Sequence, residues 1–135
     1  MSIFTIRFPL TSTTGWTILR IVVSIIIISH GSVRAIAGTV TNFGEFLGAQ
    51  GFPVGPAFAW GVTIYELIGG ASLALGFYYR PLALIFVVHQ FMGILLVHVQ
   101  HGWFVAGHGT YGIEYSVLLI ASFLAIASFN KESNQ

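Results

Sequence analysis

The chain has no cysteine and very little charge. Of its 135 residues, 7% are Asp, Glu, Lys or Arg, whereas a soluble domain carries about 25%. The absence of cysteine excludes a disulfide, a thiolate nucleophile and an iron–sulfur cluster held by this chain's own thiolates. Nucleic-acid binding needs clustered basic residues, and the formal net charge of +1 indicates no such cluster, so we expect no nucleic-acid partner.

The sequence is instead rich in apolar residues, which make up 56% of it. Four acidic and five basic residues cannot cover the surface of a soluble fold of this size. The length suits one domain, and we assign residues 1–135 to it. The composition predicts a multi-pass protein of the inner (plasma) membrane, with lipid as its immediate surroundings.

Four apolar stretches are long enough to cross a bilayer. A spanning helix needs roughly 20 residues, because the hydrocarbon core is about 30 Å thick and each residue rises about 1.5 Å. We predict spans at about 16–37, 57–79, 82–99 and 111–129. Pro56 and Pro81 stand where helix starts tolerate proline. The expected fold is all-α, an integral membrane four-helix bundle.

The basic residues predict the orientation, because they concentrate on the cytoplasmic side of membrane proteins. Arg34 falls on the outer side, and four others fall on the inner side: Arg7, Arg20, Arg80 and Lys131. Both termini are therefore predicted to be cytoplasmic. A cleaved signal peptide ending near Ala35-Ile36-Ala37 is an alternative, which the nearby Arg34 and the late start of the apolar run oppose.

The outer connection between the first two spans has a pattern of its own. Val40, Phe43, Phe46 and Leu47 recur at helical spacing. This spacing indicates a short helix in the outer membrane interface. A plain loop with scattered apolar residues is an equally good interpretation of so short a window.

Ionisable residues inside a span cost about 2.5–3.5 kcal/mol each on insertion scales, so each needs a reason. Glu66 lies about 14 Å into the second predicted span, near the bilayer midplane. No Lys or Arg is expected at that depth on any helix. The carboxyl is therefore predicted to be neutral unless a histidinium or water accompanies it.

Sorting the polar residues by depth predicts a layer in the outer half of the bundle. Its members are His30, Glu66, His98 and Glu114, with Arg34, Tyr65 and Tyr115 beside them. Such convergent groups indicate a small-ligand pocket, and the alternative is structural contact between helices. His89 and His98 are nine residues apart, and at about 100° per residue of helix their side chains would face opposite ways. We therefore assign His89 to packing.

Two cofactor alternatives are weaker. Haem held by His30 and His98 would need equal depth on facing helices, which these residues lack. A metal site of His98, His101 and a glutamate has helical spacing, but the motif is short and unspecific. We therefore predict neither group and assign no metal ligand, and no catalytic residue is assigned either.

The order of short motifs resembles the DoxX family of small four-span membrane proteins, which includes the DoxD-like subunits. The motifs are Leu19-Arg20, His30-Gly31-Ser32-Val33-Arg34, the segment 46–53, Glu66-Leu67-Ile68-Gly69-Gly70, Gly76, Arg80, His98, Gly102-Trp103-Phe104 and Gly112-Ile113-Glu114-Tyr115. Two positions depart from the family. Ser24 stands where the family has glycine. Arg34 replaces a lysine, which keeps the charge but removes a titrating amine.

The resemblance implies a membrane component of redox chemistry, since DoxD-like members are associated with thiosulfate oxidation coupled to quinone. A partner subunit would then handle the sulfur compound, while this chain offers the quinone site or the anchor. In this hypothesis Glu66 and Glu114 exchange protons and Arg34 biases protonation, while His30 and His98 bind the quinone carbonyls. The alternative is a non-catalytic scaffold or small transporter, and a homo-oligomer stays open in either case.

Overall fold

The computed structural model describes residues 11–130, and every regular element within them is helical. The α-helices are α1 (Ser12–Ile36), α2 (Val40–Ala49), α3 (Gly55–Ile64), α4 (Gly70–Leu75), α5 (Tyr79–Leu96) and α6 (Glu114–Ser128). A π-helical turn, η1 (Tyr65–Gly69), joins α3 to α4, and a 3-10 helix, η2 (His98–His101), follows α5. Arg7 and Lys131, which entered the orientation argument, lie outside the described residues.

Three helical segments are long and apolar enough to cross a membrane: α1, the continuous segment Gly55–Leu75, and α5. The fourth predicted span is shorter than expected, because α6 has 15 residues and starts at Glu114. The chain is therefore an all-helical membrane protein. Its arrangement as a four-span bundle and its cytoplasmic termini stay predictions.

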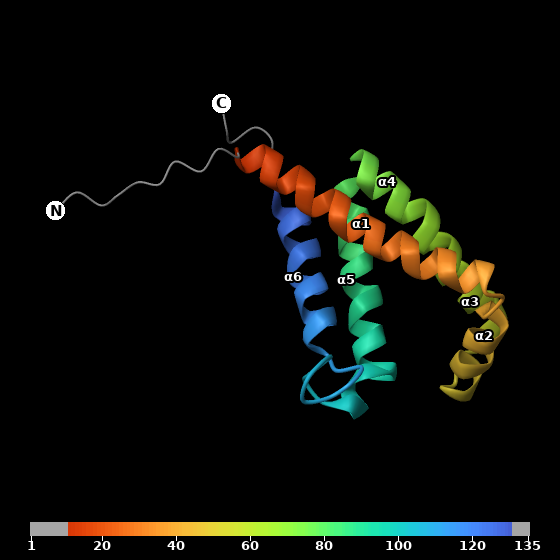
Figure 1. Ribbon diagram of the computed structural model, residues 1–135. Helices are drawn as coiled ribbons and strands as arrows, with labels where there is room; N and C mark the ends of the chain where they lie inside the picture. The colour runs from red at the N-terminus through yellow and green to blue at the C-terminus, as the bar shows by residue number, and fades with distance from the viewer. Residues whose placement is uncertain (1–10, 131–135) are drawn as a thin grey trace.

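The helices form two neighbouring sets (Figure 1): α1 packs against α3–η1–α4, and α5 packs against α6. The main core lies where the sets meet, and Ile27, Leu73, Phe86 and Phe123 are buried there. At one end of the molecule the Trp16 ring stacks on Phe129, with centroids 4.5 Å apart. The start of α1 and the end of α6 therefore lie together.

The segment after α1 is a helix rather than a plain loop. In α2 the side chains of Val40 and Leu47 are buried against Ala59 of α3. The contact is close, since a Cβ on Gly44 would lie 2.7 Å from the Cα of Pro56. Part of the apolar stripe of α2 thus packs on α3, and the depth of α2 in the membrane stays a prediction.

The connection between α4 and α5 is short, as predicted, although α5 starts earlier than the expected Leu82. Gly76 adopts a left-handed conformation (φ 86°) that ends α4, and α5 begins at Tyr79. Pro81 therefore lies in the first turn of α5, where its missing N–H costs no helical hydrogen bond.

Candidate functional site

Glu66 is buried and lies in the π-helical turn of the second span. Its side chain is 2% exposed. A π-helical turn inside an α-helix changes the direction of the side chains around it, and such turns often occur at functional sites. Helix α1 passes close to this turn, since a Cβ on Gly31 would lie 3.1 Å from the Cβ of Glu66. The absence of a side chain at Gly31 therefore allows the close approach.

Arg34 is the main partner of Glu66. Its Nη1 donates to Glu66 Oε2 at 2.7 Å and its Nη2 to Oε1 at 3.4 Å, while Nη1 also donates to the Thr63 hydroxyl at 3.2 Å. The guanidinium lies over the Phe43 ring, 4.5 Å from the centroid. The expectation that no arginine reaches the depth of Glu66 is wrong, because the long Arg34 side chain extends from α1 to the carboxylate.

His89 of α5 faces the same cluster. Its Nε2 lies 3.4 Å from Glu66 Oε1, and its Nδ1 is buried with no hydrogen-bond partner among the described residues. The prediction that His89 faces away from the site is wrong. The helical spacing argument fails because α5 ends at Leu96 and His98 belongs to η2, whose geometry differs.

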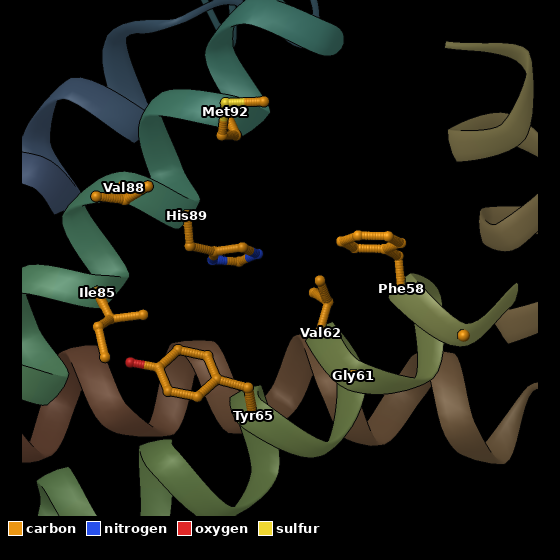
Figure 2. A pocket seen from close by; sticks show the side chains of 9 residues that line it. Phe58, Gly61, Val62, Tyr65, Ile85, Val88, His89 and Met92 are labelled. Carbon is orange, nitrogen blue, oxygen red and sulfur yellow. The ribbon is translucent and has the colours of Figure 1, made fainter. Parts of the chain in front are cut away.

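Two cavities meet at His89. The larger is an apolar cleft of about 570 Å³ between α3–η1 and α5. Figure 2 shows the His89 ring extending from α5 into this cleft, toward Phe58 and Val62 on the facing helix. The smaller cavity, of about 210 Å³, includes Glu66, Arg34 and also His89 in its lining. The imidazole is therefore the polar group shared by the apolar cleft and the buried ion pair.

Five of the predicted site residues lie around the smaller cavity. They are His30, Arg34, Glu66, His98 and Tyr115. Tyr65 instead lines the larger cleft, and its hydroxyl donates to the Leu82 carbonyl at 2.9 Å. These six residues of the predicted layer are thus divided between two neighbouring cavities.

Glu114 lies apart from this cluster. Its Oε1 accepts a hydrogen bond of 2.8 Å from the backbone N–H of Val105, and it lines a separate pocket with Val105 and Ala106. Glu114 therefore holds the loop that precedes α6. His98 has a similar contact, since its Nδ1 lies 2.7 Å from the Tyr111 carbonyl oxygen. A carbonyl only accepts, so this geometry places a proton on Nδ1 of His98.

Sequence reasoning missed Thr63, Phe43 and His89 as members of the site. Thr63 precedes Glu66 by about one helical turn, so its position on the same face was a usable signal. His89 lies in the middle of its span, as Glu66 does, and equal depth was the second signal. Within residues 11–130 no group of three His, Asp or Glu side chains is placed to hold a metal ion.

The arrangement joins an acid, a guanidinium and an imidazole in one chain of contacts. Arg34 fixes the carboxylate by two hydrogen bonds, and the imidazole lies between that carboxylate and the cleft. An imidazole in this place can pass a proton in either direction, because its two nitrogens exchange donor and acceptor roles.

Comparison with known proteins assigns the chain to a family. The DoxX family model matches residues 15–99, which is more than half of the chain. The match includes Arg34, Glu66, His89 and His98, and it ends before Glu114. No curated protein and no solved structure matches the chain significantly. On the strength of the family model, this chain belongs to the DoxX family.

Proposed function

We propose that this DoxX protein is a quinone-interacting subunit of a membrane oxidoreductase complex, and that the quinone head group binds in the apolar cleft. The observation that carries the proposal is the position of His89. Its ring reaches into the cleft, while its Nε2 lies 3.4 Å from the buried Glu66 carboxylate. A hydrophobic carrier and a source of protons would meet at this imidazole.

The walls of the cleft suit a planar, lipid-soluble ring. Phe58 and Val62 lie on one side, and Val88 and Met92 lie on the other (Figure 2). Ligand sites of this kind combine apolar walls with a few polar groups that fix orientation. Phe58 and Val88 are also exposed while they line the cleft, so a ligand dissolved in the bilayer could enter from the side.

The polar cluster behind His89 would supply protons. Reduction of a quinone to a quinol takes up two protons and two electrons, and it occurs here where water is scarce. His89 in its protonated form would donate a proton to a carbonyl oxygen of the ring, and the Glu66 carboxylate, held by Arg34, would favour that protonated form of the imidazole. The imidazole would then take up a second proton along the smaller cavity and donate it in turn, which completes the quinol. The smaller cavity extends this route toward His30 and His98. In contrast to the hypothesis from the sequence, Glu114 has no part in it.

Electrons must come from outside the chain. The sequence contains no dinucleotide-binding fingerprint and no cysteine for an iron–sulfur cluster. A partner subunit with its own redox group would therefore deliver them, which is why we propose a subunit and not a complete enzyme.

Quinone binding by the purified chain tests the proposal. Titration calorimetry in detergent with a short-chain ubiquinone or menaquinone analogue should show binding. We expect His89→Phe to weaken it by about tenfold or more, the typical loss when a hydrogen bond of over 1.4 kcal/mol disappears. Val62→Trp should block the cleft, and Glu66→Gln should also weaken binding. Glu45→Gln and His108→Phe remove similar groups at exposed positions and should change nothing.

A second candidate follows from the pairing of Glu66 with Arg34. A buried acid that is already satisfied can serve only to hold helices together, as in a scaffold that docks a soluble partner or in a small transporter. In that case Glu66→Gln and His98→Ala would lower the melting temperature, while no quinone analogue would bind or stabilise any variant. That result would exclude the quinone proposal.

A further inference from the structure

Arg20, near the start of α1, is a buried cation without an acidic partner among residues 11–130. It is 8% exposed, and no carboxylate among residues 11–130 contacts it. Of the described acids, Glu66 pairs with Arg34, Glu114 accepts from a loop N–H, and Glu45 is exposed on α2. Burying a charge is costly unless an opposite charge or several hydrogen bonds compensate it.

The guanidinium is only partly satisfied by the protein. Its Nη1 donates to the Leu73 carbonyl at 2.6 Å, and its Cζ lies 4.8 Å from the Trp16 ring centroid. A guanidinium has five N–H donors, and Nε is buried with no partner in the described part of the chain. The remaining donors therefore call for an acceptor that residues 11–130 do not provide.

A cavity of about 410 Å³ lies beside this side chain. Besides Arg20, hydroxyl, aromatic and glycine residues line this cavity: Thr13, Trp16, Thr17, Gly76, Tyr79 and Phe129. Gly76 keeps the space next to the guanidinium open, since a Cβ there would lie 2.7 Å from Nη1.

We propose that this cavity binds the phosphodiester group of an acidic membrane phospholipid. A phosphate presents two or more oxygens to the guanidinium fork, and its negative charge would balance the cation. Trp and Tyr side chains are typical of the headgroup region, and Trp16 and Tyr79 line this cavity. The surroundings therefore favour a lipid as the source of the phosphate over a free ion. The site lies apart from the quinone cleft and does not depend on it.

Native mass spectrometry of the whole protein, released from micelles, tests the site with three probes. Phosphatidylglycerol should be retained as a single bound lipid, the matching diacylglycerol without phosphate should not, and inorganic phosphate should not bind alone. Arg20→Gln should lower lipid retention by about tenfold or more, because hydrogen bonds between a guanidinium and a phosphate are charge-assisted and strong. Arg80→Gln removes an exposed charge at the same end and should retain the lipid.

A second variant serves if Arg20→Gln fails to fold. Thr17→Phe fills the cavity from α1 and leaves the Arg20 bond to Leu73 in place, so it should abolish retention without unfolding the protein. The proposal is overturned if Thr17→Phe retains phosphatidylglycerol as the wild type does, or if diacylglycerol is retained equally. Binding of inorganic phosphate without any lipid would also overturn it, because the site would then belong to a free anion.

Discussion

The two arginines of α1, Arg20 buried and Arg34 half-buried, satisfy their charges in different ways. Arg34 shares two hydrogen bonds with the Glu66 carboxylate and one with Thr63. Arg20 has a backbone carbonyl and an aromatic ring, and no acid in the described chain reaches it. Each arginine also depends on a nearby glycine, Gly31 at the Glu66 cluster and Gly76 beside Arg20.

The described fold supplies an opposite charge for Arg34, whereas residues 11–130 supply none for Arg20. The Arg34 cluster is neutral as a whole, so removing one member leaves an unpaired charge inside the protein. Among residues 11–130 the Arg20 cluster carries a net positive charge, so removing Arg20 leaves no buried anion in that part of the chain. We therefore expect the two ends of α1 to respond differently to substitution.

Breaking the ion pair should have the largest effect. Arg34→Leu should lower the free energy of unfolding by about 3–5 kcal/mol, because it leaves the Glu66 carboxylate charged and buried. Glu66→Leu should lower it less, because the Arg34 side chain is 18% exposed. The double variant Arg34→Leu/Glu66→Leu should regain most of that loss, since apolar replacement of a whole buried pair is often neutral. Denaturant unfolding in detergent measures all three.

The control for this cycle is Glu45→Gln, which removes an exposed carboxylate of α2 and should shift stability by no more than about 0.5 kcal/mol. Additive losses in the double variant would contradict the pairing, because independent residues show no coupling energy.

Replacing Arg20 should have an intermediate effect. Arg20→Met removes the hydrogen bond to Leu73, and we expect a loss of about 1.5–3 kcal/mol in the free energy of unfolding. Added phosphatidylglycerol should raise the melting temperature of the wild type and leave that of Arg20→Met unchanged, as follows from linkage between binding and stability. Equal stabilisation of both proteins would show that the lipid acts elsewhere.

The glycines should give the smallest effects, and in a definite order. Gly76→Ala should cost about 1–2 kcal/mol, since the left-handed conformation disfavours any Cβ and the new methyl group would also press on Arg20. Gly31→Ala should cost about 1 kcal/mol, the lower end for overpacking, because its backbone is ordinary helix and its neighbours, at 3.1–3.2 Å from the new Cβ, must move by only a few tenths of an ångström. Melting temperatures of the two variants measure the order, and a larger loss for Gly31→Ala would contradict it.

Much of the fold could be predicted, and less of the site. The deep position of Glu66 follows from its place in an apolar stretch. The identity of its partner, Arg34, does not follow from the sequence. The position of a residue along an ideal helix gives the depth of its backbone, and a long arginine side chain can end at a different depth. The direction of the His89 side chain was predicted wrongly because the prediction assumed one helix through His98, whereas the helix ends at Leu96.

Composition and motif order alone determined that this is a helical membrane protein of the DoxX family, because solubility and family patterns depend on residue types and not on their contacts. Only the tertiary structure decided that Arg34 closes on Glu66, that His89 joins them, and that Glu114 serves its own loop. These contacts depend on where helices end, how closely glycines let them approach and which way long side chains extend, and all three are set by packing between segments distant in the chain.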